Sequence, residues 1–223
     1  LSIEDDRAIF DLTGSHSTIK TIYNSAYGAT FSGVISGMKT FFPEVPLNAG
    51  VYRTLSIVVP DDTIVSARWP VAVSGFVMPF EKIMNATFAL FSKIMPEKAL
   101  ACAFNIEYLQ TGGYDISSQA KPFFMYYDWL AGGWGGRNGK DGLSVTASPF
   151  GVGLMAQPIE GQDRLYPVRT DGFEISTDSA GPGKWRGGLG LEKSGTFIEV
   201  EQCVLSYLCD RERAVVWGIE GGL

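Results

Sequence analysis

The sequence has few of the residues that build the commonest metal and hydrolytic sites. Its 223 residues include one histidine, His16, and three cysteines, Cys102, Cys203 and Cys209, which follow no metal-ligand spacing. A zinc site of histidine and cysteine ligands is therefore not expected, and one histidine leaves little scope for a Ser-His-Asp triad. The odd number of cysteines favours free thiols in a reducing compartment, so we expect a cytoplasmic protein.

Clustered positive charge and long apolar runs are also missing. The chain has 18 basic and 24 acidic residues, a net charge of −6, and no cluster of lysine and arginine. Because binding to nucleic acid phosphates needs a concentrated basic face, we expect no nucleic acid partner. No uninterrupted apolar stretch reaches transmembrane length and no signal peptide is visible, so we expect no membrane association.

What the sequence does contain is typical of a globular α+β domain. Hydrophobic residues make up 45% of the chain, and 27 glycines provide for many turns. Apolar residues at helical spacing predict two long helices, at about 18–39 and 80–95. Apolar, aromatic-rich stretches predict strands at 7–12, 54–60, 99–109 and 121–130 and a hairpin within 196–210. We therefore expect mixed, largely antiparallel sheets and, without repeats or linkers, a single domain over 1–223.

Nucleotide-binding motifs are absent or incomplete. A Walker A loop needs Ser or Thr after its Gly-Lys pair, whereas Gly139-Lys140 leads into Asp141 and Gly183-Lys184 into Trp185. Residues 151–156 match G-x-G-x-x-A, but Pro158 follows where a helix would have to run. No cofactor-binding residue is therefore expected in this chain.

Polar residues that accompany glycines are the remaining site candidates. Two clusters, 130–142 and 178–190, each place a tryptophan and an arginine among glycines. Glycine allows backbone N–H groups to approach a ligand closely, so the two clusters could frame one cavity. They could equally be surface turns carrying cation–π contacts, since polar residues beside glycine are common in turns and caps.

Taken in order, seven blocks of the chain resemble the B-type subunit of the hydantoinase/oxoprolinase family. The blocks are "DLTGS" (11–15), "PLNAGVYRTLSIVVPDDT" (46–63), "WPVAVSG" (69–75), "AGGWGGRNGKDG" (131–142), "QPIEGQDRLYP" (157–167), "DSAGPGKWRGGLG" (178–190) and "CDRERAVVWGIEGG" (209–222). Members of the family are considerably longer, Leu1 is not an initiator methionine, and the chain ends at "GIEGGL". We therefore expect a fragment of a longer subunit.

The resemblance implies ATP-dependent chemistry on a cyclic amide such as a hydantoin, oxoproline or a related lactam. An A-type partner, which binds ATP with Mg²⁺, phosphorylates the carbonyl oxygen of the substrate, and the B-type subunit completes the hydrolysis. In related acetone and acetophenone carboxylases the corresponding subunit acts on an activated ketone, which the aromatic residues near Tyr126 and Trp134 would suit. A scaffold that holds the ATP-binding partner without catalysing anything is the third interpretation.

Site residues follow from the blocks and from side-chain chemistry. Carboxylates can act as the base or hold a cation, and arginines can bind a phosphate or carboxylate in bidentate fashion. The expected catalytic residues are Asp11, Asp141 and Glu160, and the expected substrate-binding residues are Asn48, Gly133, Gly135, Arg137 and Arg186. A further divalent metal, Mn or Zn, would be bound by residues upstream of Leu1, so no metal ligand is assigned in this chain.

Overall fold

The computed structural model describes residues 1–151, 153–211, 213 and 216–222. The chain divides into two compact units, Leu1–Ala101 and Cys102–Leu223, and each is described by itself. Helices and strands are mixed and most strand pairs are antiparallel, which confirms the expected α+β class. The expectation of one domain stays a prediction, because compactness does not show whether each unit folds alone. No helix within the described ranges is long and apolar enough to cross a membrane.

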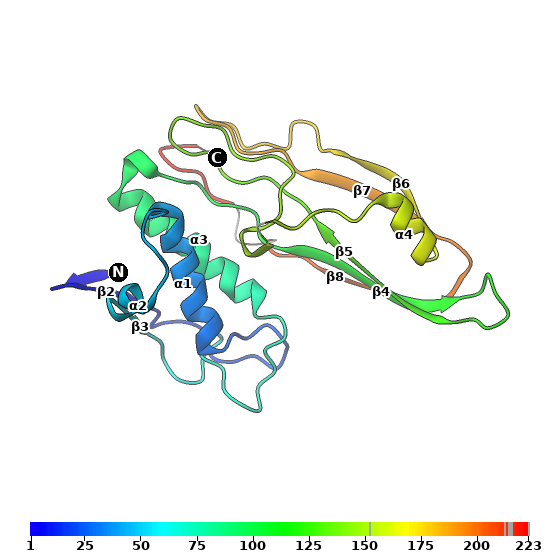
Figure 1. The fold of residues 1–223 in the computed structure, drawn as a ribbon, viewed down its shortest axis with the longest axis horizontal. Helices are drawn as coiled ribbons and strands as arrows, with labels where there is room; N and C mark the ends of the chain where they lie inside the picture. Colours follow the sequence, from blue (N-terminus) through cyan, green and yellow to red (C-terminus); the bar gives the residue numbers. More distant parts are fainter. Residues whose placement is uncertain (152, 212, 214–215, 223) are drawn as a thin grey trace. The chain divides into compact units, whose positions relative to one another are not determined.

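Unit 1 is built on two long helices, which lie side by side in Figure 1. These are α1 (Tyr27–Phe41) and α3 (Val77–Ile94), which bury apolar faces containing Phe41 and Phe88. A Cβ at Gly37 of α1 would lie 2.6 Å from Cβ of Thr87 in α3. Glycine is therefore required for this close approach of the helices. The remaining elements are β1 (Ser2–Glu4), β2 (Arg7–Asp11), α2 (Ala49–Arg53), β3 (Leu55–Val58) and the 3-10 helix η1 (Pro96–Lys98), with sheet order β1-β2-β3.

The predicted helix at 18–39 is correct in its second half and wrong in its first. Helix α1 begins at Tyr27, because the preceding residues make their hydrogen bonds elsewhere. The N–H of Thr18 donates to the carbonyl of Asp62 at 2.9 Å. The buried amide of Asn24 accepts from the N–H of Ile19 and donates to three carbonyls, including that of Ala72. These contacts fix an irregular loop, which helical spacing of apolar residues does not reveal.

Unit 2 consists of a three-stranded sheet and a two-stranded ribbon (Figure 1). The sheet has the order β5-β4-β8, from β4 (Glu107–Asp115), β5 (Phe123–Leu130) and β8 (Val200–Leu208), and the ribbon pairs β6 (Val168–Ile175) with β7 (Leu191–Phe197). A short helix, α4 (Ile159–Leu165), lies against β6, and a 3-10 helix, η2, covers Pro149–Gly151. The small core contains Phe124, Tyr126 and Val168.

The predicted hairpin within 196–210 is wrong. Strands β7 and β8 are consecutive, but β7 pairs with β6 while β8 pairs with β4. The two residues between them therefore carry the chain from the ribbon to the sheet. This arrangement places residues of β7 opposite the inner face of the sheet, where the candidate site lies.

Candidate functional site

A groove between the three-stranded sheet and the β6–β7 ribbon is the candidate site. It contains a cavity of about 310 Å³ and an adjoining hollow of about 380 Å³. Both are lined by Leu130, Lys193, Ser194 and Tyr207, so they lie next to each other. The first cavity is also lined by Leu109, Tyr126, Asp128, Val168, Thr170, Gly195 and Phe197. Its volume is at the lower end of the range found for small-molecule sites.

Strand alternation explains which side chains reach the groove. Successive residues of β5 point to opposite faces, so Phe124, Tyr126, Asp128 and Leu130 share one face. The first two of these are buried among the core residues of unit 2, whereas the next residue after each is exposed. Asp128 therefore stands beside the ribbon, on the same face of β5 as the buried Phe124 and Tyr126.

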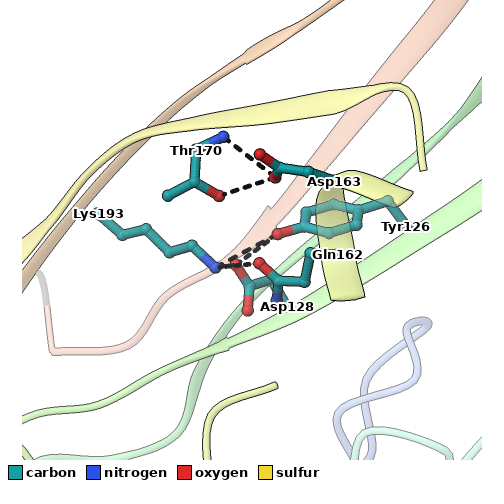
Figure 2. A network of polar contacts seen from close by, with 6 residues as sticks. All are labelled: Tyr126, Asp128, Gln162, Asp163, Thr170 and Lys193. Atoms are coloured by element: carbon teal, nitrogen blue, oxygen red, sulfur yellow. Dashed lines mark hydrogen bonds and ion pairs between the residues drawn. The ribbon is translucent and has the colours of Figure 1, made fainter. Parts of the chain in front are cut away.

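An ion pair between Lys193 and Asp128 crosses the groove (Figure 2). Each side chain is only 12% exposed. The ammonium of Lys193 also donates to Oε1 of the buried Gln162 at 3.0 Å and lies 3.4 Å from the hydroxyl of Tyr126. The same ammonium lies 5.5 Å from the centre of the Phe173 ring. Lys193 of the ribbon is thus held by the sheet and by α4 together.

Asp128 keeps one carboxylate oxygen unused. The hydroxyl of Tyr126 donates to Oδ2 of Asp128 at 2.7 Å, and the Lys193 ammonium donates to the same oxygen. The other oxygen, Oδ1, has no hydrogen-bond partner among the described residues. It is also not one of the fully buried side-chain atoms that lack a partner, which in the described residues are the hydroxyl oxygens of Thr111 and Ser148. Oδ1 of Asp128 is therefore accessible from the cavity, where it can accept a hydrogen bond from a ligand.

A second contact closes the α4 end of the groove. The N–H and the hydroxyl of Thr170 lie 3.3 Å and 3.4 Å from Oδ1 of Asp163 (Figure 2). Thr170 lines the cavity, while Asp163 belongs to α4. The contact fixes the helix on the ribbon and so holds Gln162 in position beside Lys193.

The adjoining hollow is acidic. It is lined by Glu107, Glu174 and Glu192, with Lys193 at its boundary. The hydroxyl of Tyr207 donates to Oε2 of Glu107 at 2.9 Å, and burial together with this bond raises the pKa of Tyr207 to about 12. One end of the groove therefore repels anions, while the other end is largely apolar.

Burial raises the pKa of the Tyr126 phenol above its usual value of 10.0, and its bond to Asp128 adds to the effect. Because the neutral form is favoured in the folded state, the stabilisation is complete below pH 10 and is lost as the pH rises above it. Between pH 9 and pH 11 we expect wild type to lose more unfolding free energy than Tyr126→Phe, by up to about 1.4 kcal/mol per pH unit above 10. Denaturant unfolding at both pH values measures this difference. Equal losses in the two proteins would contradict the assignment.

The residues expected from the sequence do not lie in this groove. In unit 1, Oδ1 of Asp11 accepts the N–H of Thr13 at 2.8 Å, and hydrogen bonds from Thr13 lower the pKa of this exposed carboxyl. Asn48, also in unit 1, is the N-cap of α2 and accepts the N–H groups of Gly50 and Val51. In unit 2, Glu160 is exposed in the first turn of α4. The catalytic and binding roles of these residues stay predictions.

The two glycine clusters do come together. The carboxylate of Asp141 accepts the N–H of Arg186 at 2.7 Å, and the N–H of Gly142 donates to the carbonyl of Arg186 at 2.8 Å. A Cβ at Gly133 would lie 2.0 Å from the carbonyl oxygen of Gly188. Glycine is thus needed here for contact between two backbones, and neither hollow of the groove is lined by residues 132–142 or 178–190.

Both interpretations of the clusters retain support. Arg137 is exposed at a turn closed by backbone bonds with Lys140, and Gly139 has a φ of +85°. A cation–π contact joins Lys184 to Trp185, with 5.8 Å between the ammonium and the ring centre. Substrate binding by Gly133, Gly135, Arg137 and Arg186, and catalysis by Asp141, stay predictions.

The two charged residues of the groove cavity, Asp128 and Lys193, are not among the site residues predicted from the sequence. Asp128 and Lys193 are far apart in the chain and stand beside no glycine motif, so only the fold brings them together. One signal was present, since Asp128 is in phase with Phe124 and Tyr126 on a strand predicted to be buried.

The aromatic residues of β5 divide between the two faces of the sheet. Tyr126 lines the cavity, whereas Tyr127 and Trp129 alternate with the inward residues and contact each other on the other face, with 5.6 Å between ring centres.

Metal-ligating side chains do not gather in the part of the chain that the structure describes. There, no group of three or more His, Cys, Asp or Glu side chains is placed to hold a metal ion. The nitrogen Nδ1 of His16 lies 2.7 Å from the carbonyl of the next residue, Ser17. The described residues thus do not fit a metal centre, and the expected Mg²⁺ and Mn or Zn stay predictions for protein outside them.

The sequence is similar to a known protein family and to subunits of two enzymes. The family model described as hydantoinase B/oxoprolinase matches residues 1–223. The chain is 29% identical over 184 residues to the beta subunit of the caprolactamase of Pseudomonas jessenii, covering 80% of the chain and 31% of that protein. It is 25% identical over 183 residues to the B-type subunit of a putative D-/L-hydantoinase from a Pseudomonas species, covering 82% of the chain and 30% of that protein.

A solved structure of nucleotide-free acetone carboxylase shares the fold. Its TM-score is 0.79 at 23% identity, and the match covers 92% of this chain and 28% of that one. The chain also spans only 38% of the length of a relative from Methanocaldococcus jannaschii. It therefore represents about a third of the length of these relatives.

Proposed function

Since this chain belongs to the hydantoinase B/oxoprolinase family, we propose that it is part of the B-type subunit of an ATP-dependent cyclic-amide hydrolase. The observation that carries the proposal is the family match over the whole chain. Relatives named as subunits of a caprolactamase and a hydantoinase support a cyclic amide as the substrate. The likeness to acetone carboxylase supports the fold alone.

The division of the reaction between two subunits is chemically reasonable. A cyclic amide is a poor electrophile because its nitrogen donates electrons to the carbonyl group. Phosphorylation of the carbonyl oxygen removes this protection, after which attack by water needs a base and stabilisation of the developing charge. The chain itself has no Walker A motif, and we assign ATP and Mg²⁺ to an A-type partner, as the resemblance to the family implies. In keeping with this, the two Pseudomonas relatives are each named as one subunit of an enzyme, which implies a partner for them.

An assay of the complete B-type subunit with its ATP-binding partner tests the proposal. We expect ATP consumption that depends on an added lactam, with release of the ring-opened amino acid. Dependence on a ketone and bicarbonate would replace the proposal with carboxylation. If the complex assembles but consumes no ATP with either class of substrate, the protein acts as a scaffold and the proposal fails.

A further inference from the structure

We propose that the Asp128–Lys193 pair in the groove of unit 2 binds the amide edge of a cyclic amide. The choice of ligand rests on the proposed function, whereas the site rests on geometry. The pair presents an acceptor, Oδ1 of Asp128, next to a donor, the ammonium of Lys193. Both groups line the cavity of about 310 Å³, and Figure 2 shows Tyr126 and Gln162 in contact with them.

A ring forces its amide into the cis arrangement, which matches this pair. In a trans amide, the usual form in open chains, the N–H and C=O bonds point in opposite directions. In a small lactam the two bonds lie on the same edge of the molecule. The N–H on such an edge can donate to Oδ1 of Asp128, while the carbonyl oxygen accepts a hydrogen bond from the ammonium of Lys193. This bond would replace the 3.4 Å contact between the Lys193 ammonium and the hydroxyl of Tyr126.

The rest of the cavity suits the rest of a lactam. Leu109, Val168 and Phe197 supply apolar walls for the methylene groups of the ring. The hydroxyls of Thr170 and Ser194 lie at the lining and can bond to polar substituents. The combination of apolar walls with a few convergent polar groups is typical of small-molecule sites.

The ion pair is also pre-organised for binding. Gln162 holds the ammonium from α4 and Tyr126 holds the carboxylate from β5, so neither charged group needs to reorder when a ligand enters. Hydrogen bonds from a ligand to these charged groups would be stronger than those between neutral groups. Loss of one such bond is expected to weaken binding about tenfold or more.

The test is a titration of the complete chain with three probes, followed by saturation-transfer NMR or calorimetry. The probes are 2-pyrrolidone, N-methyl-2-pyrrolidone, which has no N–H, and N-methylacetamide, which is a trans amide. We expect 2-pyrrolidone to bind at least about tenfold more tightly than the other two. Equal binding of all three probes, or no binding of 2-pyrrolidone, overturns the proposal.

Variants locate the binding. Asp128→Asn is expected to weaken 2-pyrrolidone binding about tenfold or more. The matched control is Asp171→Asn, which alters an exposed carboxylate of β6 that accepts from Arg169 and Thr196 and does not line the cavity. If Asp128→Asn does not fold, the double variant Asp128→Leu with Lys193→Met, which removes both charges, must lose the preference for 2-pyrrolidone. Unchanged affinity in the folded variant overturns the proposal.

The binding titration and the ATP-consumption assay can fail independently, so together they distinguish the proposed binding site from the proposed function. If the assembled enzyme consumes ATP with a lactam but the groove does not bind 2-pyrrolidone, the function stands and the site is elsewhere. If the groove shows the expected preference but the assembled enzyme responds to no lactam, the proposed hydrolysis fails and cis-amide binding remains.

Discussion

Lys193→Met is expected to lower the free energy of unfolding by about 3–5 kcal/mol. The substitution removes the ammonium from a pair whose side chains are each 12% exposed, which leaves the carboxylate of Asp128 largely buried and without its counter-ion. Gln162 and Tyr126 would also lose a donor. Chemical denaturation of the complete chain, followed by circular dichroism, measures the change.

Two further variants show whether the effect comes from the unpaired charge. Lys121→Met breaks an ion pair with Glu201 whose side chains are 54% and 52% exposed, so its expected cost is at most about 1 kcal/mol. Adding Asp128→Leu to Lys193→Met should recover most of the lost stability, because no buried charge is then left unpaired. Equal losses for Lys193→Met and Lys121→Met would mean that the groove pair is solvated in solution.

Gly133→Ala is expected to cost about 3 kcal/mol, at the upper end of the usual range for overpacking. The new Cβ would lie 2.0 Å from the carbonyl oxygen and 2.5 Å from the carbonyl carbon of Gly188. Backbone atoms cannot rotate away as a flexible side chain can, so the two clusters would have to separate. The hydrogen bonds that join them, such as the N–H of Gly188 to the carbonyl of Trp134 at 2.8 Å, would be broken.

Gly161→Ala is the matched control for the glycine experiment. Its Cβ would meet its nearest atom, Nε2 of Gln157, at 3.9 Å, which is ordinary contact. Because Gly161 lies in α4, alanine should be neutral or stabilise by up to about 1 kcal/mol. Thermal melts of the two variants are sufficient to compare them. A Gly133→Ala protein as stable as wild type would show that the clusters do not pack through their backbones.

Local patterns in the sequence predicted elements well where packing is simple. The period of apolar residues from Phe80 onward predicted α3, because one face of this helix is buried along most of its length. The α+β class followed from two helices among many strands. The strand at 121–130 was confirmed as β5, whose alternating burial agrees with its apolar and aromatic residues.

Other features depend on contacts that a local pattern does not encode. The start of α1 is decided by Asn24, whose amide bonds reach the carbonyl of Ala72, 48 residues away in the chain. The strand expected at 99–109 begins only at Glu107, because residues 101–106 are largely buried yet join no strand ladder within the described ranges. Strand β8 likewise pairs with β4, which is distant in the sequence, and not with the neighbouring β7.

The candidate site also depends on contacts between residues that are far apart in the chain, so local patterns do not predict it. The glycine clusters suggest either a cavity wall or surface turns in the sequence, whereas their contact with each other is a long-range feature: the nearest atoms to a Cβ at Gly133, Gly142 or Gly188 belong to the backbone. Asp128 and Lys193 carry no local motif and are 65 residues apart. The one local signal is that Asp128 is in phase with the buried Phe124 and Tyr126 on its strand, and it says nothing about Lys193.

The most direct test of this account is to locate a bound lactam on the complete chain. Amide chemical shifts recorded during a titration with 2-pyrrolidone would report the position residue by residue. We predict that the largest changes occur at Asp128, Lys193 and Ser194, with little change at residues 132–142. Largest changes within 132–142 or 178–190, with Asp128 and Lys193 unaffected, would contradict the assignment of the groove as the cyclic-amide site.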